Sequence, residues 1–250
     1  MRAIYILFFL LYTVMFVNGE ELKDTLFYND NTTQISTQKL ILPTSLILVG
    51  SLGVCNNKLQ SVNHSIRDYM TDLRGDNYFR ADDYFQYLPV ISHIGLEGIG
   101  VKSKHPFKER LIVATTSYLA MGIMVNGVKY TVRERRPDLS ARNSFPSGHT
   151  ATAFMGAELV RIEYGNGFGI GMYAIASGVA FLRLYNDRHW FNDVVAGAGT
   201  GILSARIGYW LLPVNKKLFN LDKKKSPMIA TMPTYDYRNQ ALGMTFVAQF

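Results

Sequence analysis

A histidine and an aspartate near residue 190 have the types and spacing needed for nucleophilic chemistry. His189 and Asp193 are four residues apart, and on a helix this spacing brings the two side chains together. The aspartate can accept the hydrogen of one ring nitrogen and leave the other nitrogen as a neutral lone pair aimed at phosphorus. Arg183 precedes them and offers a forked donor for two phosphate oxygens. For an isolated His–Asp pair, a structural contact would be the preferred interpretation.

A second group lies in the turn of residues 143–150, NSFPSGHT, which leads into a helix predicted to begin near residue 151. The start of a helix offers unpaired backbone N–H groups and a positive dipole, which together favour an anion. Ser147 can add a hydroxyl donor, and Gly148 allows a phosphate to approach the backbone. His149 would stand at the edge of this site, where it can protonate a leaving oxygen. Its alternative role is that of a helix-capping histidine.

The third group is a pair of cations. Lys129 and Arg136 are seven residues apart, so two turns of helix should place both on one face, with Pro137 ending or bending that helix. Two permanent cations side by side at the end of an apolar span require an anion between them. Ordinary flanking charge at a membrane boundary is the alternative, and it is preferred for three neighbouring arginines: Arg133, Arg135 and Arg142.

Apolar segments must position these three groups. The chain has 250 residues, of which 48% are hydrophobic and only 18% charged, less charge than an ordinary soluble domain carries. Gly and Ala are frequent in the best candidate helices, and such small residues let membrane helices approach closely. The pattern predicts an all-α, compact transmembrane bundle of about five to six core helices. The strong apolar segments are 111–128, 151–160, 168–184 and 194–212, and the weaker ones are 40–54 and 88–101.

The chain divides into five parts by composition. Residues 1–19 have one arginine before an apolar run, as in a signal peptide or signal anchor, and residues 20–39 form a polar linker. Residues 40–87 combine a short apolar segment with amphipathic, aromatic-rich stretches suited to the membrane interface. The catalytic bundle is expected at 88–213, followed by a basic tail at 214–250 without a predicted helix or role. No internal repeat is visible.

Positive charge indicates the orientation in the membrane. Basic clusters lie at 102–110 and 216–225, and the positive-inside rule assigns both to the cytoplasm. Residues 129–149 and 183–193 then meet on the opposite face. If residues 1–19 are removed, 40–54 and 88–101 cannot both cross, so we expect either a retained signal or a shallow position for 40–54. Nucleic-acid binding is disfavoured, because the net charge of +7 forms no continuous stripe.

The three groups closely resemble the signature of the type-2 phosphatidic acid phosphatase superfamily. They occur in its order and spacing: Lys-(six)-Arg-Pro, Pro-Ser-Gly-His, then Arg-(five)-His-(three)-Asp, over about half of the chain. The resemblance implies a nucleophile at His189, its orienting partner at Asp193 and a general acid at His149. It implies that the phosphate is held by five residues, Lys129, Arg136, Ser147, Gly148 and Arg183. No metal and no other cofactor is expected.

The resemblance also suggests the substrates and the location. A phosphorylated membrane lipid is expected, with undecaprenyl diphosphate, lipid A phosphates, phosphatidylglycerol phosphate and phosphatidic acid as candidates. The enzyme would lie in a bacterial inner membrane with its site on the periplasmic face. A secreted nonspecific acid phosphatase or a vanadate-dependent haloperoxidase uses the same scaffold in soluble form. The apolar helices of this chain argue against a soluble protein. A silent lipid-phosphate-binding protein is a third alternative. The oligomeric state is not predicted.

A few positions carry separate expectations. Leu182 stands where the superfamily usually has Ser, which puts one supporting hydrogen bond in doubt. Arg188 is extra positive charge beside the predicted nucleophile, for a second anionic group or as a solvated charge, and Asp187 is expected to neutralise it. The single Cys55 excludes an internal disulfide and is expected to be buried. Three further histidines are expected to be structural or surface residues: His64, His93 and His105.

Overall fold

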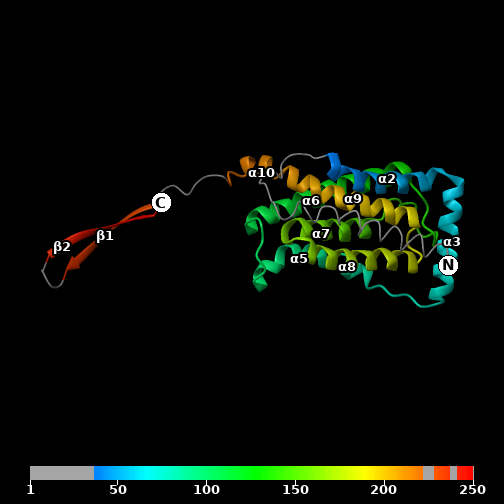
Figure 1. Cartoon of the computed structure of the whole chain (residues 1–250), viewed down its shortest axis with the longest axis horizontal. Helices are drawn as coiled ribbons and strands as arrows, with labels where there is room; N and C mark the ends of the chain where they lie inside the picture. The colour runs from blue at the N-terminus through cyan, green and yellow to red at the C-terminus, as the bar shows by residue number, and fades with distance from the viewer. Residues whose placement is uncertain (1–36, 222–227, 237–240, 250) are drawn as a thin grey trace. The chain divides into compact units, whose positions relative to one another are not determined.

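A computed structural model describes residues 37–221, 228–236 and 241–249, so the expected signal segment lies outside the described residues. The chain forms two compact units, Met1–Leu212 and Pro213–Phe250, and each is described here by itself. The first unit contains helices α2 to α9, and Figure 1 shows most of them lying lengthwise side by side. Their bounds are α2 Thr37–Cys55, α3 Asn57–Arg74, α4 Asp82–Phe85, α5 Leu88–Gly95, the 3₁₀ helix η2 Leu96–Ile99, α6 Phe107–Val132, α7 Gly148–Tyr164, α8 Asn166–Tyr185 and α9 Phe191–Trp210.

Helix α9 is the centre of the bundle, and α2, α6 and α7 pack directly against it. Glycines on α9 make this close packing possible. A Cβ atom at Gly201 would lie 2.2 Å from the carbonyl oxygen of Ala151 on α7, and one at Gly199 would lie 2.6 Å from that of Pro43 on α2. Helices α8 and α5 complete the bundle by packing against α7. The predicted all-α, small-residue bundle is therefore confirmed.

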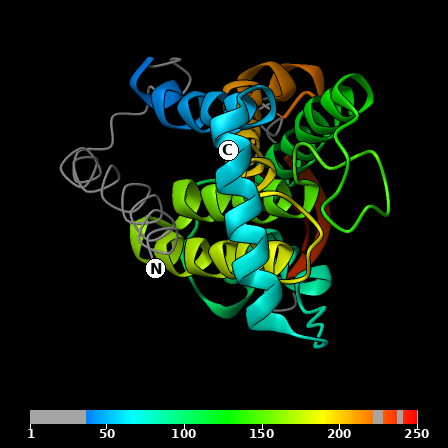
Figure 2. The same cartoon turned by 90° about the vertical axis from the view of Figure 1, so that its right-hand side faces the viewer.

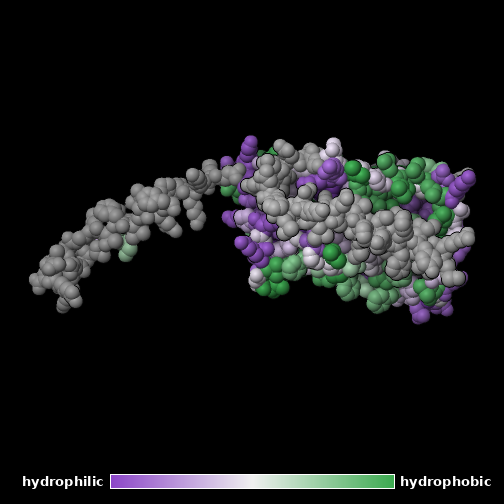
Figure 3. Space-filling model, in the orientation of Figure 1, coloured by the Kyte–Doolittle hydropathy of each residue, from purple (hydrophilic) through white to green (hydrophobic). Residues whose placement is uncertain are grey.

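Among the described residues, three helices are long and apolar enough to cross a membrane: α2, α6 and α8. They contain the apolar segments predicted at 40–54, 111–128 and 168–184. Helix α9, which contains most of the segment 194–212, is not among them, and its neighbours bury it along nearly its whole length. Figure 3 shows apolar residues on the sides of the bundle and hydrophilic residues toward its two ends, as expected for a membrane protein.

Helix α2 contains residues 40–54, for which a shallow position was one of two alternatives, and its depth in a membrane stays a prediction. It runs antiparallel to α9: a Cβ atom at Gly53 would meet Asn192 near the start of α9, whereas Pro43 lies against Gly199 two turns further on. With 19 residues, α2 is also longer than the apolar segment 40–54 that it contains. Cys55 at its end is exposed, so the prediction of a buried cysteine was wrong. The cause is that the helix ends there, beyond its packed face.

Helix α3 lies across one end of the bundle, as Figure 2 shows. It begins after Asn56, whose side chain accepts the backbone N–H of Lys58 at 2.9 Å and so caps the helix. Short helix α4 and several exposed aromatic side chains follow on the same part of the chain, including Phe79 and Tyr84. Helical structure in the interfacial region 56–87 was expected. Its position relative to the lipid headgroups stays a prediction.

The second unit differs from the expectation for the tail. Helix α10, Leu212–Leu218, is followed by strands β1, Met228–Asp236, and β2, Ala241–Gln249. The strands form an antiparallel pair whose register runs from Met228 opposite Gln249 to Asp236 opposite Ala241. No hairpin was predicted, because the apolar and polar stretches of this tail are too short to give a periodic signal.

Candidate active site

His189 lies in the short connection between α8 and α9 and is only 3% exposed. Its Nδ1 atom is 3.3 Å from Oδ2 of Asp193. The spacing suggested that both residues lie on one helix, but α9 begins at Phe191 and His189 precedes it. Asp193 instead occupies the first turn, where its carboxylate also accepts the backbone N–H of Trp190 at 2.9 Å. This cap fixes the carboxylate, and the carboxylate in turn meets the ring.

Ser144 contacts both His189 and Asp193, although the sequence did not single it out as a site residue. It is fully buried, its hydroxyl donates to Oδ2 of Asp193, and its Oγ lies 3.4 Å from Nδ1 of His189. Its backbone N–H donates to the carbonyl of Glu134 at 3.0 Å, which ties the loop after α6 to the site. The only signal was a hydroxyl in the turn of residues 143–150, and serine is a common turn former.

The predicted site residues surround the buried ring. Burial lowers the pKa of His189 well below its ordinary value, and the positive charges of Arg183, Lys129, Arg136 and His149 lower it further, in that order. These four residues come from α8, α6, the loop after α6 and α7. The structure therefore brings all three sequence groups to one end of the bundle. The ring is neutral at neutral pH, as a nucleophile must be.

Asn143 connects the two predicted phosphate-binding cations. Its backbone carbonyl accepts from Lys129 Nζ at 2.6 Å, and its side-chain oxygen accepts from Arg136 Nε at 3.0 Å. Helical spacing was the wrong reason for their proximity, because α6 ends at Val132, well before Pro137. The chain turns at Arg133, with φ of 51°, and the loop then carries Arg136 back toward the site.

Neither Lys129 nor Arg136 has a carboxylate within ion-pair distance among the described residues. Burial lowers the pKa of Arg136, and the charge of Arg183 lowers it further. Uncompensated cations that repel one another are stabilised by a bound anion. This part of the site therefore fits a phosphate group.

Ser147 and Gly148 occupy the start of α7 as predicted. The backbone N–H of Ser147 is not free for a phosphate, however, because it donates to the carbonyl of Asp193 at 3.0 Å. Its buried hydroxyl accepts from Thr150 at 3.0 Å and can still donate. At Gly148 the backbone faces open space, since an added Cβ atom would meet nothing nearer than a methyl group of Val125 at 3.9 Å. A ligand can approach the chain there.

A pocket of about 230 Å³ opens beside these residues. Arg136, His149 and Arg183 line it together with residues that the sequence did not assign to the site. The lining residues from outside the predicted set are Tyr78, Arg80, Asp82, Asp83, Asn186 and Arg188. Four of these come from the chain around α4, so the region expected to lie at the interface contributes one wall of the pocket.

Two adjacent carboxylates of α4 contact predicted site residues. Asp82, which is 1% exposed, accepts from Arg183 at 2.6 Å, and Asp83 lies 3.0 Å from Nε2 of His149. The ligand atoms of Asp82, Asp83 and His149 lie within 4.8 Å of one another, a spacing that a metal ion could use. The guanidinium of Arg183 already compensates Asp82, which disfavours a cation at this position.

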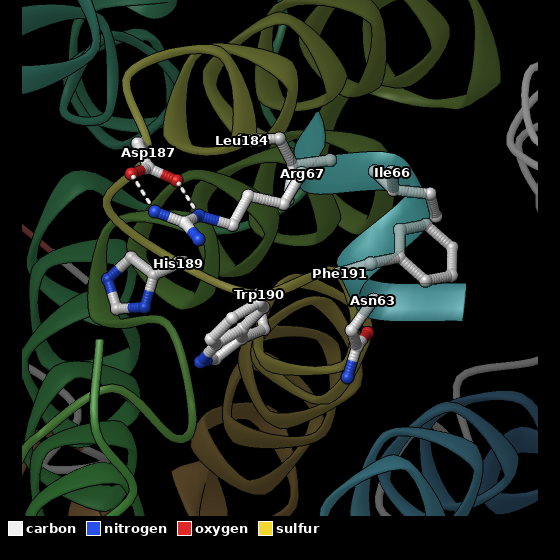
Figure 4. Close-up of a pocket in the computed structure, with 8 residues that line it drawn as sticks. All are labelled: Asn63, Ile66, Arg67, Leu184, Asp187, His189, Trp190 and Phe191. Carbon is white, nitrogen blue, oxygen red and sulfur yellow. Dashed lines mark hydrogen bonds and ion pairs between the residues drawn. The ribbon is translucent and has the colours of Figure 1, made fainter. Parts of the chain in front are cut away.

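The charges beside His189 are paired differently from the expectation. Asp187 does not neutralise Arg188. Its two oxygens accept from Arg67 of α3 at 2.8 and 3.1 Å, and Figure 4 shows this guanidinium beside His189 and Trp190. Arg188 instead donates to Asp138 at 3.0 Å. The reason is that Asp187 adopts a positive φ of 57°, which turns its side chain away from its neighbour in sequence.

Comparison with known proteins agrees with the fold. Residues 110–217 match the family described as the PAP2 superfamily, the family that the three sequence groups resemble. The matched stretch contains all eight predicted site residues. Asp82 and Asp83 lie outside it. Three helices of spanning length in this fold make the chain an integral membrane protein.

Individual relatives are more distant or partial. A lipid A 1-phosphatase of Porphyromonas gingivalis is 37% identical over 155 residues, which is 60% of this chain and 35% of that protein. The chain thus spans about a third of the length of this curated relative. The transmembrane PAP2-type phosphatidylglycerolphosphate phosphatase from Bacillus subtilis has a TM-score of 0.50 at 21% identity, covering 74% of this chain and 98% of that one. LpxE of Aquifex aeolicus has a TM-score of 0.44 at 20% identity, covering 56% and 92%.

Proposed function

We propose that the protein hydrolyses a phosphate ester or diphosphate of a membrane lipid through a phosphohistidine on His189. One observation supports this above all others. A buried, neutral imidazole has one nitrogen held by Asp193, and cations from three separate segments surround it. A purely structural His–Asp pair needs no such ring of positive charge, which is costly to assemble without an anion.

In the first step, Nε2 of His189 attacks phosphorus and the bond to the lipid oxygen breaks. Nδ1 faces Asp193, so the hydrogen resides there and the Nε2 lone pair is free. His149 gives a proton to the departing oxygen. Lys129, Arg136 and Arg183, with the hydroxyl of Ser147, compensate the charge on the phosphoryl oxygens. Space at Gly148 admits one of these oxygens close to the backbone.

In the second step, water attacks the phosphohistidine and inorganic phosphate leaves. His149, now neutral, accepts a proton from this water, which returns both histidines to their starting states. The carboxylate of Asp193 stabilises the positive ring of His189 while the phosphoryl group is attached. Every proton is accounted for by side chains of the described site, and no metal ion takes part in either step.

The substrate proposed first is a lipid A 1-phosphate, because the partial relative from Porphyromonas gingivalis bears that activity in its name. Undecaprenyl diphosphate is the second candidate. We place the site on the periplasmic face of a bacterial inner membrane. The starts of α7 and α9 lie at the site, whereas the basic residues of 102–110 precede α6 at the opposite end of the bundle.

Phosphate release from purified protein in detergent tests this function. The protein is offered lipid A, undecaprenyl diphosphate, phosphatidylglycerol phosphate and phosphatidic acid, each with and without a chelator. We expect the fastest release from lipid A, no effect of the chelator, and no release by the variant His189→Ala. Equal release by this variant would contradict the role of His189. Loss of activity in chelator would contradict a metal-free reaction and direct attention to Asp82, Asp83 and His149.

A further inference from the structure

The two oxygens of Asp193 differ in their hydrogen bonding. Oδ2 accepts from the N–H of Trp190 and from the hydroxyl of Ser144, and it faces Nδ1 of His189. Oδ1 is buried and has no hydrogen-bond donor among the described residues. A buried carboxylate oxygen without a donor is costly. A donor for Oδ1 is therefore expected close by.

Glu134 is the group that meets this requirement. It lies in the loop that follows α6, and its carboxyl group interacts with that of Asp193. Its Oε2 atom is also buried and also without a partner. Its own backbone carbonyl holds the N–H of Ser144, so the position of Glu134 is fixed relative to the pair.

Two carboxyl groups in contact at a buried position cannot both be ionised without strong repulsion. They can share one proton, as paired acids do in other proteins. The donors on Oδ2 favour the ionised form of Asp193, because a carboxylate accepting several hydrogen bonds is stabilised as an anion. Lys129 and Arg136 favour it too, since both interact with the charge of Asp193.

We propose that Glu134 and Asp193 share a single proton, with Glu134 as the donor to Oδ1, and that Glu134 is a positioning residue for the predicted nucleophile. Its hydrogen bond completes the set that fixes the carboxylate, and the carboxylate fixes the tautomer of His189. Burial raises the pKa of both carboxyl groups, that of Asp193 well above its ordinary range, which agrees with one proton held between them. The link to catalysis rests on the function proposed above, whereas the shared proton does not.

Substitution at Glu134 separates this role from a structural one. In Glu134→Gln the amide N–H can donate to Oδ1 without any titratable proton, so kcat should stay within about threefold of the native value. In Glu134→Ala the donor is lost, and kcat should fall by about tenfold or more with KM little changed. The alkaline limb of the native pH–rate profile should reflect loss of the shared proton. The profile of Glu134→Gln should lack this limb. Equal losses in both variants would overturn the proposal.

Infrared difference spectroscopy tests the proton directly and does not depend on activity. The spectrum of the protein minus that of Glu134→Gln should show the carbonyl band of a protonated carboxylic acid at neutral pH. The same band should appear when both proteins also carry His189→Ala. Glu97→Gln is the matched control, because Glu97 is partly exposed and paired with Arg110, and its difference spectrum should lack the band. Absence of the band for Glu134 would refute the shared proton, whereas absence of lipid phosphatase activity would refute only the proposed function.

Discussion

Asp193→Asn is the substitution whose effect follows most directly from the geometry. In the native site the carboxylate accepts the hydrogen of His189 Nδ1, and Nε2 keeps its lone pair. An asparagine can donate its amide N–H to Nδ1, which moves the ring hydrogen to Nε2 and blocks attack on phosphorus. The neutral ring makes this tautomer change possible, since burial and nearby cations lower the pKa of His189.

The expected magnitude comes from the hydrogen bond that is lost. A charge-assisted hydrogen bond to a buried carboxylate is worth about 1.5–3 kcal/mol. At about 1.4 kcal/mol per factor of ten, kcat should fall by about 10- to 150-fold. Asp193 is fully buried, so solvent does not reduce this value. KM should change little, because the cations that hold the phosphate are untouched.

The assay is steady-state phosphate release, and Asp187→Asn is its matched control. Asp187 is also buried and also next to His189, but it pairs with Arg67. Asparagine tolerates its positive φ of 57°. We expect a lower unfolding temperature for this variant and a nearly native kcat. A native kcat for Asp193→Asn, or equal loss of kcat in both variants, would refute the proposed role of Asp193.

Three further predictions test the charges, the acid and the packing. Arg136→Gln removes a cation that lowers the pKa of His189, so this pKa should rise. On acidification, activity should then be lost at a higher pH than in the native protein, as a pH–rate profile measures. Asp83→Asn removes the partner of His149 and should lower kcat by about three- to tenfold, more for alkyl than for aryl phosphates, because only poor leaving groups need full protonation. Gly201→Ala places a methyl group against α7 and should destabilise the bundle by about 1–3 kcal/mol, measured as a lower unfolding temperature in detergent.

The sequence predicted the bundle because its signals are strong and local. The strong apolar segments 111–128 and 168–184 became α6 and α8, the weaker segment 40–54 became α2, and the Gly-rich segment after residue 194 became the buried central helix α9. It did not predict that α2 packs lengthwise on α9, because contacts such as that of Gly53 with Asn192 join positions far apart in the chain. The hairpin of the tail was missed for lack of periodicity.

The site was predicted as a set of residues more reliably than as a geometry. All three groups converge, yet Arg136 reaches its place through a loop and not along a helix. His189 likewise precedes the helix that carries Asp193. Residues outside the signature were missed because their roles depend on tertiary contacts. Asp83 arrives from α4, and Glu134 matters only because it meets the buried carboxylate.

Capture of the covalent intermediate tests the central claim most directly. Native protein mixed with a phosphorylated lipid substrate is quenched within its first turnovers under alkaline conditions, which preserve phosphohistidine, and its peptides are analysed by mass spectrometry. We predict a phosphoryl group on His189, absent from His189→Ala. Turnover at the native rate with the phosphoryl group on another side chain, or sustained turnover by His189→Ala, would contradict the mechanism.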